Sequence, residues 1–270
     1  MDWKEFACGI SLSKEAVEQI EEVGMTEAQY EQMRGLYCLD HELFFQEECE
    51  KDKAAQRFLA FYSRMACDVY EKYKKEGIEE GIFWDTFQDL RFWSENYYQE
   101  HGSYGIGAYD WFWRHMDMTV FRLGRLQFEQ MKMGYTVGKG EKTILQGTPV
   151  INIHIPQGEP MEWDACQRSF AEAGRRFGWE KPYVCHSWLL YPGLKQFLKP
   201  SSNILEFQKH FYILEEDFKE KEAEERLFGK QYQSIEEYPQ QTSLQKAVKK
   251  YLLEGNQMGN GWGILIDWGE

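Results

Sequence analysis

With 270 residues, 43% of them hydrophobic and 16% aromatic, the chain is long and apolar enough for one large domain or two, which excludes a wholly disordered protein. The 31 basic residues are outnumbered by 45 acidic ones, and the net charge of −14 argues against nucleic acid or anionic membrane as partners. No apolar run approaches a membrane span and the first residues lack a signal-peptide pattern, so we expect a cytoplasmic protein.

Four amphipathic segments in the first hundred residues predict a helical lobe. The first follows Ser13, an N-cap candidate, and stops at Gly24. A second begins at Thr26 with a similar pattern. Two longer helices are predicted over 51–77 and 84–102 from apolar residues at helical spacing. We expect their aromatic stripes to form the core of this lobe.

From about residue 118 the pattern changes to strands that alternate with helices. A Gly- and aromatic-rich connection leads into a β-type run over 118–133, in which Gly124 fits a bulge. Strand 150–155 precedes a helix over 161–179. The remaining predictions are strand 181–192, short helical turns over 193–211 capped at Ser202 or Asn203, strand 211–217, a solvated helix or loop over 215–230, helix 242–255 and strand 261–268.

The alternation predicts an α+β protein in which a helical N-terminal lobe precedes a mixed β-sheet flanked by helices. We place the helical lobe at residues 1–117 and the sheet domain at 118–270. The hairpin 118–147 is left open: it belongs to the sheet or bridges the two lobes.

The candidate binding site is the stretch VINIHIPQGEPMEWDACQRSF, residues 150–170. If Pro156 ends a strand and Trp163 lies in a helix, the loop 157–160 lies at the helix N-terminus, where N–H groups and the helix dipole favour an anion. Pro156 cannot donate to a sheet ladder, so pairing with the next strand should fail there and leave a slot. An ordinary strand-to-helix turn is the alternative, and the mechanics alone favour it.

Several stretches of the sequence resemble the GNAT-like acyltransferase family with a helical N-terminal N-acyltransferase domain. They are LGRLQFE, NIHIPQGEP, CHSWLL, SNILEFQ and TSLQKA, which lie between residues 121 and 254. The resemblance implies that acyl-CoA or acetyl-CoA lies between strands 150–155 and 183–190, with its pyrophosphate at a helix that starts near Met161. The implied contacts are Ile155, Pro156, Gln157, Gly158 and Met161.

The loop departs from the pattern of the wider superfamily, which marks the pyrophosphate site with Gln/Arg-x-x-Gly-x-Gly/Ala. Here the corresponding place reads IPQGEPMEW, with one glycine and with Glu159 close to the expected phosphate. A catalytically inactive GNAT-like module that binds a small molecule or a protein partner is therefore the second hypothesis.

The reaction implied by the resemblance moves an acyl group from CoA, or another pantetheine thioester, to an amine or hydroxyl of a small-molecule acceptor. It needs a base for the attacking group and an acid for the leaving thiolate, and histidine titrates near neutrality. The candidates are His186, His154, Tyr191 and Ser187, with Tyr191 as the expected proton donor. Each histidine is alternatively an ordinary core residue.

Two other kinds of chemistry find no support in the sequence. Cys185 should face away from His186 in a regular strand, so a Cys–His dyad is not expected. No metal-ligand spacing occurs among the histidines, so no metal cofactor is expected. The alternating glycines of GNGWGILI, residues 259–266, indicate a close approach of backbone to a strand more than a nucleotide loop.

Overall fold

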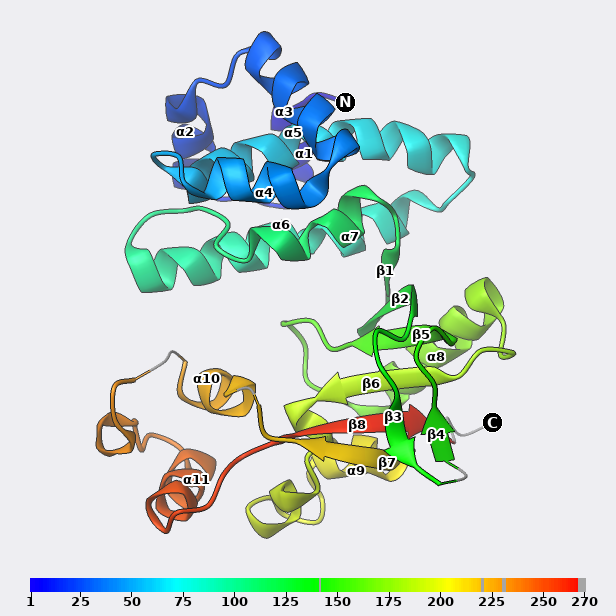
Figure 1. The fold of residues 1–270 in the computed structure, drawn as a ribbon. Helices are drawn as coiled ribbons and strands as arrows, with labels where there is room; N and C mark the ends of the chain where they lie inside the picture. Colours follow the sequence, from blue (N-terminus) through cyan, green and yellow to red (C-terminus); the bar gives the residue numbers. More distant parts are fainter. Residues whose placement is uncertain (141, 220, 230–231, 267–270) are drawn as a thin grey trace. The chain divides into compact units, whose positions relative to one another are not determined.

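A computed structural model of the protein describes residues 1–140, 142–219, 221–229 and 232–266 (Figure 1). The chain divides into two compact units, Met1–Leu123 and Gly124–Glu270. Helices make up nearly all of the first unit and a mixed sheet with helices makes up the second, so the predicted α+β class is confirmed. Among the described residues, no helix has both the length and the apolar character needed to cross a bilayer.

The first unit contains the four predicted helices and several that were not predicted. Its elements are α1 (Trp3–Gly9), α2 (Lys14–Val23), α3 (Glu27–Leu39), α4 (His41–Cys49), α5 (Ala54–Lys75), α6 (Glu80–His101), the 3-10 turn η1 (Tyr109–Trp111), α7 (Trp113–Met116) and strand β1 (Val120–Leu123). Ser13 caps α2 by accepting from the Ala16 N–H, and Gly24 ends it with φ +61°. These two predicted boundaries are therefore confirmed.

Helix α5 forms the centre of the first unit, in contact with α1, α2, α3, α4 and α6. Its apolar stripe is buried as predicted, including Phe58 and Tyr62. Aromatic rings from other elements pack on this stripe, for example Phe44, whose ring centroid lies 4.9 Å from that of Phe61. The Tyr62 hydroxyl donates to the carbonyl of Tyr109 at 2.6 Å, which ties η1 to the same core.

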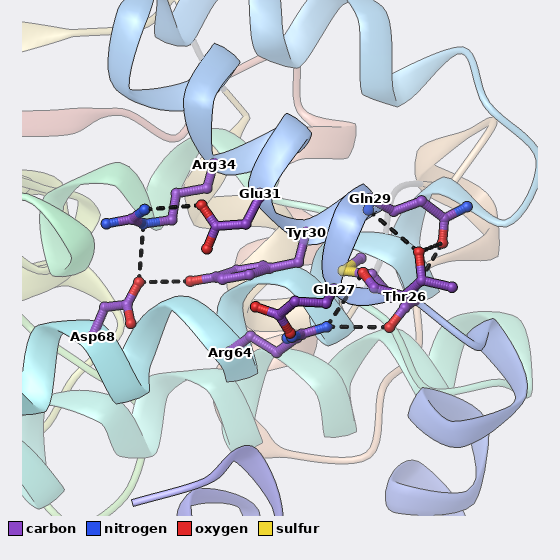
Figure 2. A network of polar contacts seen from close by, with 9 residues as sticks. Thr26, Glu27, Gln29, Tyr30, Glu31, Arg34, Arg64 and Asp68 are labelled. Carbon is purple, nitrogen blue, oxygen red and sulfur yellow. Dashed lines mark hydrogen bonds and ion pairs between the residues drawn. The ribbon is translucent and has the colours of Figure 1, made fainter.

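A polar network fastens α3 to α5 (Figure 2). The Tyr30 hydroxyl donates to Asp68 at 2.7 Å, and Arg34 Nε lies 3.0 Å from the same carboxylate. Arg64 stacks over the Tyr30 ring at 4.4 Å and donates to the carbonyl of Met25 at 3.1 Å. Burial, and then the bond to Asp68, raise the pKa of Tyr30, so its hydroxyl remains a donor in this network.

The second unit is built on a mixed sheet in the order β2-β5-β6-β8-β7 (Figure 1). Strands β5 and β6 run parallel, whereas the pairs β2–β5, β6–β8 and β7–β8 are antiparallel. In chain order, the elements of the second unit are β2 (Leu126–Lys132), β3 (Val137–Lys139), β4 (Lys142–Ile144), β5 (Pro149–His154), α8 (Trp163–Phe177), β6 (Tyr183–Ser187), the 3-10 turns η2 (Trp188–Leu190) and η3 (Pro192–Gln196), α9 (Asn203–Lys209), β7 (Phe211–Asp217), α10 (Glu222–Phe228), the 3-10 turn η4 (Ile235–Glu237), α11 (Ser243–Leu253) and β8 (Asn260–Leu265).

The two faces of this sheet are covered differently. Aromatic side chains join one face to α8 and α9: the rings of Phe128 and Phe170 are 5.9 Å apart, and Phe170 also contacts Phe207. On the other face, the β3–β4 hairpin forms a hydrophobic cluster that includes Val150 and Trp262. The helices therefore bury one face, and the hairpin covers only part of the other.

Two strand predictions need correction. The run 118–133 is not one strand with a bulge at Gly124, because β1 and β2 are separate strands joined by a turn. Gly124 has φ +68° in this turn, a conformation that favours glycine. The strand predicted over 183–190 ends at Ser187, whose Oγ accepts from the Leu189 N–H at 3.2 Å and starts the 3-10 turn η2.

The predicted strand over 211–217 is β7. The stretch that follows was predicted as a solvated helix or loop, and its described residues contain the helix α10, which buries Ala223 and Phe228. The last predicted strand is β8, and its predicted residues 267 and 268 lie outside the described residues.

The predicted close approach of backbone to the glycines of β8 occurs, and the element that approaches is the unpredicted turn η2. A Cβ at Gly261 would lie 2.4 Å from the carbonyl oxygen of Leu190, closer than real Cβ contacts. A Cβ at Gly263 would lie 2.8 Å from a side-chain methyl of the same leucine. Only residues without a Cβ at these two positions leave room for Leu190, and so for the turn that follows β6.

Candidate functional site

The ladder between the two central strands ends partway along them. Strands β5 and β6 are in register only at Ile151–Tyr183 and Asn152–Val184. Beyond this point β5 still pairs with β2 as far as His154, and β6 still pairs with β8 to its end. The two strands therefore part, each held by its outer neighbour. The last β5–β6 pair, at Asn152, lies four residues before Pro156, so the proline is not the only cause of the parting.

Both candidate histidines lie on the same face of the sheet. Residues paired in register share a face, and side chains two residues apart along a strand do so as well. His154 and His186 each follow the last β5–β6 pair by two residues, so they occupy matching positions on either side of the parting. Cys185 is on the opposite face and 1% exposed, and burial raises the pKa of its thiol. A Cys–His dyad is therefore absent here.

His154 is held by a buried carboxylate. Its Nε2 lies 2.8 Å from Oε2 of Glu129, a residue of β2 that is 2% exposed. A proton on Nε2 satisfies the carboxylate, and the lone pair of the neutral ring is then on Nδ1. This tautomer provides a base whose orientation is fixed by Glu129.

His186 forms a second histidine–carboxylate pair on the other side of the parting. Its Nε2 lies 3.6 Å from Oδ2 of Asp217, the last residue of β7. The imidazole is stacked on the indole of Trp262, with centroids 4.6 Å apart and planes at 16°. Trp262 is in turn held by a bond from its Nε1 to the hydroxyl of Tyr135 at 3.1 Å. The stacking fixes the plane of the His186 ring.

The loop after β5 leads into α8, which begins at Trp163, two residues after Met161. Glu162, the N-cap of α8 in the described chain, makes no side-chain capping bond, so it does not shield the N–H groups of the first turn. Gly158 has φ +132°, a conformation that strains other residues. Glu159 is exposed to solvent, which keeps its charge well hydrated beside the loop.

Arg125 holds this loop through hydrogen bonds to its main chain, and the sequence predictions missed it. Its side chain is buried, and its Nη1 donates to the carbonyl of Pro156 at 2.9 Å. Its Nε lies 3.4 Å from the carbonyl of Pro160, at the other end of the loop. Its positive charge also acts on α8: burial raises the pKa of the Cys166 thiol to about 11, and Arg125 opposes this rise.

The two other catalytic candidates lie elsewhere. Ser187 follows His186 on β6, so it points to the opposite face, and it caps η2. Tyr191 follows η2 and is 5% exposed, with its hydroxyl 3.4 Å from the carbonyl of Gln257. Burial, and then a hydrogen bond with Tyr251, raise the pKa of Tyr191. A catalytic role for Ser187 or Tyr191 stays a prediction.

The described residues include no group of three or more His, Cys, Asp or Glu side chains that could hold a metal ion. The polar groups near the parting are instead arranged as two separate histidine–carboxylate pairs. Such pairs are suited to proton transfer.

The fold is that of a GNAT-like acyltransferase. The family model described as the GNAT-like C-terminal domain matches residues 120–265, and that of the N-acyltransferase N-terminal domain matches residues 1–118. The chain belongs to this acyltransferase family, and the two models together match nearly all of it. The resemblance found in the sequence is thereby confirmed.

Solved structures of acyltransferases are similar to the whole chain. One, in complex with decanoyl-CoA and teicoplanin, is 20% identical with a TM-score of 0.77, over 97% of this chain and 86% of that one. A mutant acyltransferase with octanoyl-CoA is 20% identical with a TM-score of 0.76, over 97% and 87%. A further complex with decanoyl-CoA is 22% identical with a TM-score of 0.75, over 97% and 86%. At these identities the likeness shows a shared fold. No protein of curated function matches the sequence.

Proposed function

We propose that the protein transfers an acyl group from acyl-CoA to an amine or hydroxyl of a small-molecule acceptor. The observation that carries this proposal is the parting of β5 and β6 after Asn152 and Val184, beside the start of α8. Family membership supports the acyltransferase class, and the similar structures with decanoyl-CoA and octanoyl-CoA support CoA thioesters as donors. A slender thioester tail fits between two strands that part.

The proposed donor site follows the chain from β5 into α8. The pantetheine arm would lie along Ile155 and Pro156, where β5 ends. The diphosphate would lie at Gln157, Gly158 and Met161, at the N-terminus of a helix of 15 residues. The fit is supported by the exposed loop, by the positive φ of Gly158 and by the cation of Arg125 behind it.

The proposed chemistry uses the two histidines on the shared face of the sheet. The acceptor nitrogen or oxygen attacks the thioester carbonyl carbon, its proton passes to Nδ1 of His154, and the carbon–sulfur bond breaks. The leaving thiolate takes a proton from His186, which lies beside the Asp217 carboxylate. His154 is assigned as base because Glu129 contacts it more closely than Asp217 contacts His186.

The acceptor is proposed only as a class. One similar structure holds teicoplanin, which supports a small molecule, rather than a protein or nucleic acid, as the acyl acceptor of this chain.

The division into domains at residues 117 and 118 and a cytoplasmic location stay predictions.

Calorimetry with decanoyl-CoA, acetyl-CoA and free CoA tests the donor. We expect at least one acyl-CoA to bind with a Kd below about 1 mM, which corresponds to a binding free energy of about −4 kcal/mol or stronger. If none of the three binds at millimolar concentration, the proposal is wrong. An inactive binding module predicts a different outcome, namely that acyl-CoA binds but no free thiol appears when amines and alcohols are added.

A further inference from the structure

Arg125 occupies a turn that is tied to α8. Its main-chain N–H donates to Oγ of Ser169 at 2.8 Å, and the N–H of Leu126 lies 3.4 Å from the same oxygen. Ser169 is a fully buried residue of α8 and also donates to the carbonyl of Ala165. The turn before β2 and the first half of α8 therefore form one connected support, to which the Arg125 side chain is anchored.

The guanidinium determines which way the loop faces. It donates hydrogen bonds to the carbonyls of Pro156 and Pro160, one at each end of the loop. Every peptide bond in the described part of the chain is trans, so each carbonyl points away from the N–H that follows it. The N–H groups of Gln157 and Met161 are therefore turned away from Arg125. A loop with its carbonyls turned inward presents donors on its other side, as an anion requires.

The charge of Arg125 opposes two unfavourable contributions to anion binding. The chain carries a net charge of −14, and Glu159 lies in the loop while Glu162 follows it. Both glutamates are exposed, so water and salt screen them. Arg125 is 7% exposed, so its field is screened less, and a guanidinium remains protonated throughout the ordinary pH range.

We infer that Arg125 is the residue that positions the loop for the diphosphate of acyl-CoA, acting from behind the loop and without touching the reacting thioester. The inference rests on the proposed function. It also accounts for how a loop that lacks the glycine-rich signature can receive a phosphate: the donors are oriented by a buried cation rather than by glycines.

The test compares two acyl donors, of which only one carries the diphosphate that Arg125 is inferred to help bind. Decanoyl-CoA and S-decanoyl-pantetheine share the tail and the thioester, but only the first carries the diphosphate. Their Kd values are measured by calorimetry for the wild-type protein and for Arg125→Met. We expect the variant to weaken decanoyl-CoA binding by about 10- to 100-fold, as expected for the loss of one well-placed charged contact, and S-decanoyl-pantetheine binding by less than about 3-fold.

Two further variants keep the test decisive. Arg175→Met removes an exposed charge from the last turn of α8 and should leave both Kd values unchanged. Arg125→Lys keeps the positive charge but lacks the several N–H donors of the guanidinium. It is used if Arg125→Met does not fold. It should weaken decanoyl-CoA binding selectively, by about 3- to 10-fold.

The outcomes separate this inference from the function on which it rests. If the wild-type protein binds neither compound, the proposed function fails. If it binds decanoyl-CoA but the folded Arg125 variant weakens both compounds equally, or neither, then Arg125 has no diphosphate-positioning role and the inference is overturned. A wild-type protein that binds both compounds with equal affinity overturns the inference as well.

Discussion

Replacing His154 with glutamine is expected to lower turnover by about 100- to 10,000-fold, the usual contribution of a positioned general base. Glutamine can still donate to Glu129, so the variant does not leave a buried carboxylate without a donor. It cannot accept a proton near neutral pH. The Kd for acyl-CoA should therefore remain within about 2-fold of the wild-type value, because the loss lies in the chemical step. Release of free CoA thiol measures turnover.

His101→Gln is the matched control for this prediction. His101 ends α6 in the first unit, where its side chain is 46% exposed, so the same substitution removes an imidazole that is not part of the sheet. The control should retain wild-type turnover. Unchanged turnover in His154→Gln would remove His154 as the base, and a large loss in the control would show that the assay reports on stability instead.

Gly261→Ala is expected to destabilise the second unit by about 1–3 kcal/mol, the usual cost of forcing an extra carbon into a packed core. The new Cβ would lie 2.4 Å from the main-chain oxygen of Leu190, and a backbone atom cannot move aside by changing its rotamer. The 3-10 turn η2 must therefore shift away from β8. Denaturant unfolding followed by circular dichroism measures the loss.

A glycine with room around it provides the comparison. Nothing lies within 4 Å of a Cβ built on Gly134, which is exposed in the same unit. Gly134→Ala should change the free energy of unfolding by no more than about 0.5 kcal/mol. Equal effects from the two substitutions would contradict the close approach of η2 to β8.

Segments with strong local signals were predicted well. The caps at Ser13, Thr26 and Ser202 all accept backbone bonds from the first turns of their helices. The apolar stripe of α5 is buried as expected, because the helix spans enough turns for its period to stand out. Local chemistry decides such elements, so the sequence is sufficient to place them.

Elements that depend on tertiary contacts were missed. Helix α4 buries Phe44 without a clear apolar stripe, and α1 has only seven residues, although Asp2 and Glu5 form a capping box that signals its start. The end of β6 was placed too late because an apolar run such as SWLL is compatible with a strand or a buried turn. The contact of Leu190 with Gly261, far along the chain, decides for the turn.

The sequence placed both histidines but not the groups that orient them. Glu129 and Asp217 come from strands on opposite sides of the central pair, and only the pairing of β2 with β5 and of β7 with β8 brings them near. The sequence offered a weak signal for Glu129: the alternation in β2 puts its side chain on the face of the sheet away from that of Phe128. Arg125 gave no signal, because its partners are carbonyls of a loop more than thirty residues away.

The proposed reaction depends on β5 and β6 parting beyond Asn152 and Val184 to admit a thioester. A crystal structure of the protein with decanoyl-CoA tests this claim most directly. The predicted result is a pantetheine arm between the two strands, a diphosphate at the start of α8 and the thioester carbonyl on the face of His154 and His186. Strands hydrogen-bonded to each other along their full length, with the ligand absent or bound elsewhere, would contradict it.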